Sequence, residues 1–156
     1  MVRNLASAPW PYSEEDARKF TALPIAPLRP RFLVTRVQDA AAIGCIGIDL
    51  PPAEDGEGAG TIEVGYWIAR PYWGQGYATE AGRAVLSVAR MLGYSRVIGS
   101  HFLDNPASGK VLRKLGFEAT GRVVERHSYG RGEMAPTAEY ALEFAGHTVG
   151  GDVCAA

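Results

Sequence analysis

The chain has 156 residues, of which 47% are hydrophobic and 21% charged, and 16 Lys and Arg stand against 17 Asp and Glu. These values are typical of one globular domain, and the near-neutral charge argues against a protein that binds nucleic-acid phosphates or a membrane surface. No apolar run reaches the 18 residues of a membrane-spanning helix, and Cys45 and Cys154 form no disulfide framework, so a cytoplasmic protein is expected. The 19 glycines are the unusual part of the composition, and their positions guide the interpretation.

One helix and three strands are expected in the first half of the chain. Ser13 precedes three acidic residues, a pattern that begins a helix, and Pro24 ends it. The Gly- and Pro-rich segment 51–60 predicts a turn. Apolar and β-branched residues predict strands over 31–37, 41–50 and 61–69.

Helices and strands alternate in the second half. Apolar residues at helical spacing predict a helix over 76–92, and Asn105 followed by Pro106 begins another, which ends at Gly116. Further strands are expected over 96–103, 117–126 and 137–144. This order predicts a single α/β (α+β) domain with a mixed sheet over residues 1–145, followed by a flexible tail, 146–156, without periodicity.

The segment 63–80, EVGYWIARPYWGQGYATE, places a strand, a turn with Gly74 and Gly76, and a helix start in direct succession. The first backbone N–H groups of a helix have no partner within it, and glycines let a phosphate approach them without a Cβ in the way. The spacing lacks both the Gly-Lys-Ser/Thr of a nucleotide-triphosphate loop and the third glycine of a dinucleotide fingerprint. From these residues alone, a phosphate site and a plain tight turn are equally open.

The same turn resembles motif A of the GNAT superfamily of N-acetyltransferases, with Trp73 where Arg or Gln is more usual. Residues Gly65–Ile68 and Trp73–Ala81 resemble the branch that contains the ribosomal-protein N-terminal acetyltransferases. A second block, Asn105–Ser108 followed by Val111–Phe117, is similar to the Asn-x-x-Ser helix and Leu-Gly-Phe turn of the family. The resemblance implies a GNAT-like, mostly antiparallel sheet, flanked by helices and splayed in its middle by a bulged strand. Gly65, a glycine inside this strand, suggests either that bulge or a close backbone approach.

The resemblance also implies acetyl-coenzyme A as cosubstrate, without a metal. Asn105 would orient the pantetheine arm, with a plain helix cap as the alternative. The end of the third strand would pair with the pantetheine amides through Trp67, Ile68 and Ala69. The pyrophosphate would be held by the backbone N–H groups of Gly74, Gln75, Gly76, Tyr77, Ala78 and Thr79.

An N-acetyltransferase needs a base for the attacking amine and a hydrogen-bond donor or acid for the departing thiolate. By resemblance, Ser108 is the candidate acid, and Glu63 and His127 are the candidate bases. The alternative for Glu63 is a solvent-facing strand residue without a catalytic role. His127 stands where some relatives carry Glu, and its alternative is a solvated loop residue. His101 and His147 lack the spacing of metal ligands, so no metal site is predicted.

The predicted function is transfer of an acetyl group to a primary amine, on a protein N-terminus or a small molecule, by direct attack in a ternary complex. A non-catalytic acyl-CoA-binding or sensor module on the same fold is the alternative. Relatives have a strand and a helix before the segment that begins at Tyr12, and here that strand and helix are expected to be missing. Either the start of the domain is shortened, or a segment of a second chain completes the sheet. The second alternative would favour a homodimer.

Overall fold

The computed structural model describes residues 4–24, 26–52 and 60–144, so the expected tail and the middle of the predicted turn 51–60 lie outside the described residues. The elements follow the expected order along the chain: α1 (Glu14–Thr21), β1 (Arg31–Thr35), β2 (Ala42–Asp49), β3 (Thr61–Ile68), the 3-10 turn η3 (Arg70–Tyr72), α2 (Tyr77–Met91), β4 (Arg96–Phe102), α3 (Pro106–Lys114), β5 (Glu118–Ser128) and β6 (Glu133–Glu143).

The strands form one six-stranded sheet in the order β1-β2-β3-β4-β6-β5. Strands β3 and β4 run parallel, and the other neighbouring pairs are antiparallel. The predicted fold class, a mixed and mostly antiparallel sheet flanked by helices, is confirmed.

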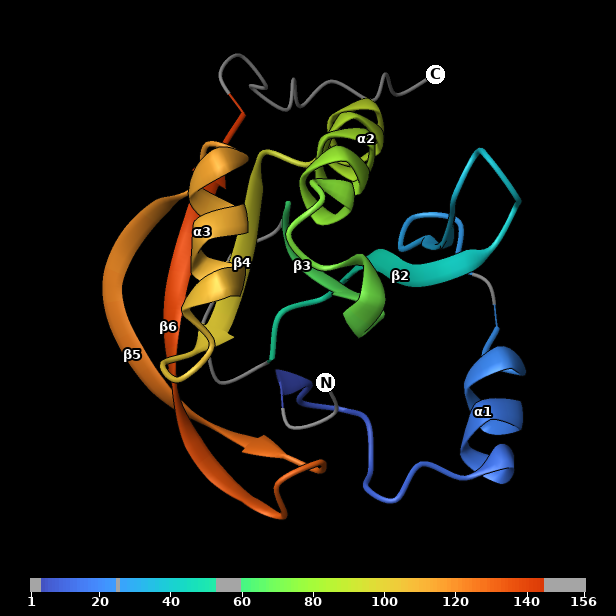
Figure 1. Ribbon diagram of the computed structural model, residues 1–156. Helices are drawn as coiled ribbons and strands as arrows, with labels where there is room; N and C mark the ends of the chain where they lie inside the picture. Colours follow the sequence, from blue (N-terminus) through green and yellow to red (C-terminus); the bar gives the residue numbers. More distant parts are fainter. Residues whose placement is uncertain (1–3, 25, 53–59, 145–156) are drawn as a thin grey trace, which may run out of the picture.

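Helices α2 and α3 lie side by side over one face of the sheet, whereas α1 stands apart from it (Figure 1). Both α2 and α3 are amphipathic and bury one apolar stripe, while α1 buries none of its residues. None of these helices, within the part of the chain described, is long and apolar enough to cross a membrane. The core between the two helices and the sheet includes Val85, Leu86, Ala89, Leu112, Ile46, Ile62, Val64, Val97 and Tyr140.

Strands β5 and β6 are longer than the sequence predicts. The sequence predicts a loop between residues 126 and 137, but only the turn 129–132 connects the two strands. The predicted bounds of this loop are therefore wrong. Pro136 obscured the strand, because a proline cannot donate to a sheet ladder. In the structure the Pro136 carbonyl accepts from Leu103 N–H, one position past the last β4–β6 pair. In an antiparallel strand the nitrogen and the carbonyl of a residue point to the same side. The proline nitrogen therefore lies beyond the end of β4, and no hydrogen bond between β4 and β6 is lost.

Helix α3 packs so closely on β4 that Gly99 is required beneath it. A Cβ on Gly99 would lie 2.5 Å from Leu112 Cδ2, and Leu112 is only 1% exposed. The leucine therefore has no free space into which it can move.

Replacing Gly99→Ala is expected to lower the free energy of unfolding by about 1–3 kcal/mol, the usual cost of overpacking a core. Urea unfolding followed by circular dichroism measures it. Gly65→Ala is the matched control, because Gly65 is also a strand glycine and no atom lies within 4 Å of its added Cβ. Equal stability of the two variants would contradict this account of α3 packing.

Candidate active site

Strands β3 and β4 pair over only three residues and then separate (Figure 1). The last partners are Glu63 and Ile98. Beyond them, β3 continues to Ile68 beside β2, and β4 continues to Phe102 beside β6. The two strands therefore present open edges to each other, and an open edge can pair with an extended ligand. The predicted splay in the middle of the sheet is present.

The splay forms without the bulge expected at Gly65. The β2–β3 register runs without a shift from Gly44 opposite Ile68 to Asp49 opposite Glu63, and Gly65 lies opposite Gly47. The bulge prediction is therefore wrong. Past the point of separation each strand keeps its antiparallel partner, β3 along β2 and β4 along β6.

Alternate residues of β3 turn their backbone groups toward the opening. Ala69 N–H donates to the Ile43 carbonyl of β2 at 2.7 Å. Backbone groups of successive strand residues point to opposite sides, so the N–H groups of Tyr66 and Ile68 point to the open side. Of the three residues predicted to pair with pantetheine, Ile68 thus has its N–H on the open side. Ala69 uses its N–H within the sheet, and Trp67 is in phase with Ala69.

The turn between β3 and α2 depends on two glycines in the left-handed region, Gly74 with φ 73° and Gly76 with φ 90°. Other residues enter this region only at a cost, because their Cβ clashes with the backbone. Side chains tie the turn to the structure before it. Trp73 Nε1 donates to the Ile68 carbonyl at 2.6 Å, and Gln75 Nε2 donates to the Pro71 carbonyl at 3.0 Å.

This turn leaves a row of backbone donors without an acceptor in the described structure. The row comprises the N–H groups of Gly74, Gln75, Gly76, Tyr77 and Ala78, five of the six predicted to hold pyrophosphate. The sixth, Thr79 N–H, donates to the Gly76 carbonyl at 2.9 Å. Because the row lies at the positive end of a 15-residue helix, it suits a diphosphate.

The N-terminus of α3 borders the same opening, since α3 follows directly from β4. Asn105 occupies the cap position, but its side chain makes no capping hydrogen bond, so the plain-cap alternative does not account for it. Asn105 is half-buried, and its side chain has no hydrogen-bond partner among the described residues. One turn further on, Ser108 Oγ lies 2.8 Å from the phenol oxygen of Tyr66.

Tyr66 was missed by sequence reasoning. Its phenol also lies 3.2 Å from the Ser108 carbonyl, so the pair joins β3 to α3 across the opening. Burial raises the pKa of Tyr66, with the Ser108 hydrogen bond acting in the other direction. The available signal was alternation: Tyr66 shares a strand face with the buried Val64 and Ile68, and this face looks toward the helices.

Glu63 stands where the strands separate, on the sheet face opposite α2 and α3. Its Oε1 accepts from Ser100 Oγ at 2.7 Å and from Arg126 Nη1 at 2.8 Å, and its Oε2 accepts from Arg126 at 3.0 Å. The Glu63 side chain is 19% exposed. It is therefore a partly buried, ion-paired carboxylate rather than a solvent-facing strand residue, and Arg126 is a partner that the sequence did not reveal.

The structure does not bring the second candidate base, His127, near Glu63. His127 is an exposed residue of β5 whose ring meets the Tyr129 ring edge-on at 4.8 Å. It follows Arg126 in the strand, so it points away from the face that Arg126 shares with Glu63. Among the described residues, no three His, Cys, Asp or Glu side chains gather as a metal site would require.

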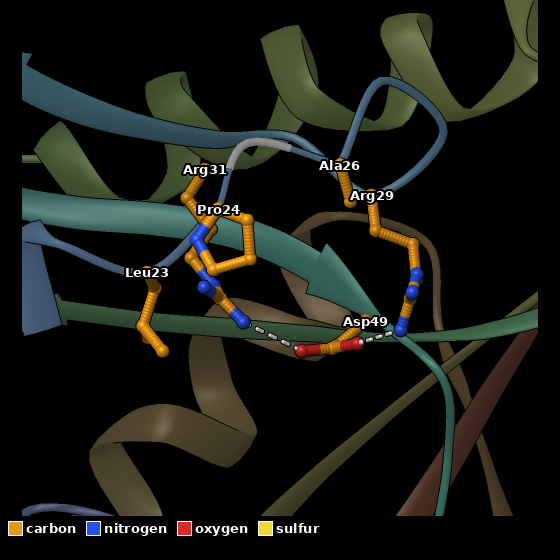
Figure 2. Close-up of a pocket in the computed structure, with 6 residues that line it drawn as sticks. All are labelled: Leu23, Pro24, Ala26, Arg29, Arg31 and Asp49. Carbon is orange, nitrogen blue, oxygen red and sulfur yellow. Dashed lines mark hydrogen bonds and ion pairs between the residues drawn. The ribbon is translucent and has the colours of Figure 1, made fainter.

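A surface hollow of about 190 Å³ lies near the start of the sheet, between the segment after α1 and β2 (Figure 2). Its Asp49 accepts from Arg29 at 3.1 Å and from Arg31 at 2.8 Å. Burial works against ionisation, but hydrogen bonds from Leu50 N–H and the two guanidinium groups hold the pKa of Asp49 below its usual value. These ion pairs fasten the connector to the sheet, and none of the predicted site residues lines the hollow.

Comparison with known proteins identifies the family to which this mixed, centrally opened sheet belongs. Residues 1–118 match the family model described as "Acetyltransferase (GNAT) domain". This match covers most of the chain, and the protein belongs to the GNAT acetyltransferase domain family.

Individual relatives agree with this assignment. The chain is 36% identical over 81 residues to "Uncharacterized N-acetyltransferase YoaA" of Bacillus subtilis, covering 51% of this chain and 45% of that protein. It is 26% identical over 120 residues to "Uncharacterized N-acetyltransferase p20" of Bacillus licheniformis, covering 74% of this chain and 65% of that one. A solved structure of a "putative acetyltransferase" from T. thermophilus matches with a TM-score of 0.72 and 25% identity, over 91% of this chain and 73% of that one. The matched region thus spans about half to two thirds of the curated relatives.

Proposed function

We propose that this protein is an acetyl-coenzyme A-dependent N-acetyltransferase that transfers the acetyl group to a primary amine by direct attack in a ternary complex. The observation that carries the proposal is the continuity between the open edge of β3 and the five N–H groups of the glycine turn. One extended ligand with a diphosphate at one end and amides along its arm suits both. Coenzyme A has this chemistry, and its acetyl thioester supplies an activated acyl group.

The residues around the opening have complementary tasks in this proposal. Glu63, held in place by its hydrogen bonds from Arg126, accepts a proton from the acceptor ammonium, directly or through water. The neutral nitrogen then bonds to the acetyl carbonyl carbon, the C–S bond breaks, the sulfur departs with the electron pair, and the nitrogen gives up its second proton to water to form the amide. The Ser108 hydroxyl donates a hydrogen bond to that sulfur, and the Asn105 amide orients the arm.

The acceptor approaches from the Glu63 face of the sheet, opposite the helices. The similarity of Gly65–Ile68 and Trp73–Ala81 to ribosomal-protein N-terminal acetyltransferases supports a protein N-terminus as acceptor. A small primary amine suits the same chemistry, since either acceptor presents one ammonium group to one carboxylate.

One observation favours the second candidate function, a non-catalytic acyl-CoA-binding or sensor module. The Glu63 carboxylate is already engaged by Arg126 and Ser100, and a committed carboxylate is a less accessible base. Coenzyme release with peptides, polyamines, amino acids and aminoglycosides as acceptors discriminates the two functions. Release above the acceptor-free rate with any of them establishes catalysis, and binding without release establishes the sensor.

Replacing Gly76→Asp is expected to weaken acetyl-coenzyme A binding by more than about tenfold, because a carboxylate is placed beside the N–H row that holds the diphosphate. Isothermal titration calorimetry measures the dissociation constant.

Gly132→Asp is the matched control for this substitution. Gly132 also has a positive φ, 74°, with no atom near the added Cβ, but it lies in the β5–β6 turn. Unchanged affinity in Gly76→Asp, or an equal loss in both variants, would contradict the pyrophosphate assignment.

Replacing Glu63→Gln is expected to lower kcat by about 10²-fold or more, because the amide cannot take the ammonium proton. Steady-state coenzyme release with the best acceptor measures it. Glu125→Gln, an exposed glutamate on β5, is the control with unchanged kcat. A normal kcat in Glu63→Gln together with a large loss in His127→Ala would transfer the base role to His127.

A further inference from the structure

The contact between Tyr66 and Ser108 is the described polar contact that joins β3 to α3 across the opening. It lies on the helix face of the sheet, the face opposite Glu63. Nothing in the proposed reaction so far uses Tyr66, although its side chain reaches the hydroxyl assigned to the departing sulfur. The inference below rests on the proposed function and deepens it.

We propose that Tyr66 is a positioning residue whose phenol donates to Ser108 Oγ and thereby aims the Ser108 proton at the sulfur of coenzyme A. A serine hydroxyl has one proton and two acceptor lone pairs, and without a partner it rotates among staggered positions. A donor fixed on one lone pair restricts this rotation. The Ser108 proton then stays available to the ligand.

The packing of Tyr66 makes it suitable for this task. Its neighbours on the same face of β3, Val64 and Ile68, are 5% and 7% exposed, and the Tyr66 ring packs against the core. The β2–β3 register is regular on both sides of Tyr66. A tyrosine ring has only two side-chain torsions, so a ring held by the core fixes its phenol oxygen.

Tyr66 itself keeps its proton. Burial raises its pKa, so forming a phenolate at this position is unfavourable. In the step that Ser108 assists, the C–S bond breaks, the sulfur keeps the electron pair, and the Ser108 proton hydrogen-bonds to it without leaving the oxygen. The first amine proton leaves on the other face of the sheet through Glu63, and the second passes to water as the amide forms.

The alternative arrangement of protons makes the opposite prediction. If Ser108 donates to Tyr66 and the phenol donates to the Ser108 carbonyl, the Ser108 proton is turned away from the ligand. Removing the phenol would then free the Ser108 proton and strengthen its hydrogen bond to sulfur. The sign of the effect of Tyr66→Phe therefore decides between the two.

The experiment compares the calorimetric affinities of coenzyme A and desulfo-coenzyme A for four proteins: wild type, Tyr66→Phe, Ser108→Ala and the double variant. At a pH where the bound thiol is ionised, wild type is expected to prefer coenzyme A by roughly tenfold, because a hydrogen bond to a charged group is a strong one. Tyr66→Phe is expected to reduce this preference about fivefold, and Ser108→Ala to remove it. The double variant should match Ser108→Ala, since the two residues act as one unit.

Tyr94→Phe is the matched control. The Tyr94 phenol donates to the Leu28 carbonyl at 2.8 Å, so this substitution also removes one hydrogen bond from a tyrosine, but away from the opening. Tyr94→Phe should keep the wild-type preference. In coenzyme-release kinetics, Tyr66→Phe should lower kcat several-fold with little change in the KM for acetyl-coenzyme A, a split that general destabilisation does not produce.

Tyr66→Met is a second variant without a hydroxyl. The measurement uses whichever variant, Tyr66→Phe or Tyr66→Met, keeps the wild-type circular dichroism spectrum. An unchanged or increased preference for coenzyme A in that variant overturns the role of Tyr66 and leaves the proposed function standing. Absence of coenzyme A binding by wild type overturns both the inference and the proposed function.

Discussion

Strand β3 leaves β4 after three paired residues, and the geometry of the whole site follows from this separation. Each strand stays paired on its other side with an antiparallel partner, β3 with β2 and β4 with β6. The unpaired edges would be unfavourable if they were buried without a ligand. They are instead left beside the glycine turn and the start of α3, where an extended polar molecule can satisfy them.

The separation also divides the chemistry between two faces of the sheet. Ser108 and Tyr66 meet on the face covered by the helices, where the leaving group is assisted in our account. Glu63 lies on the other face, bound by Arg126 and Ser100, and in our proposal it takes a proton from the amine there. Donor and acceptor can thus approach the same carbonyl carbon from opposite sides. Direct transfer in a ternary complex requires such an approach.

Features of this site that depend on neighbouring residues were predictable from the sequence, and features that depend on distant pairing were not. Gly74 and Gly76 predicted the turn before α2, because a positive φ is a local property. The Tyr66–Ser108 and Glu63–Arg126 contacts join residues 42 and 63 positions apart, and no local pattern indicates them. The bulge at Gly65 was wrong for the same reason, since a register is set by the partner strand.

The most direct test is a titration of ¹⁵N-labelled protein with acetyl-coenzyme A, followed through the amide resonances of its backbone. The account predicts saturable shifts concentrated at Gly74–Ala78 and at Tyr66 and Ile68, the donors that face the opening. Shifts concentrated around Arg29 and Arg31 beside the hollow of Figure 2, with Gly74–Ala78 unaffected, would contradict it.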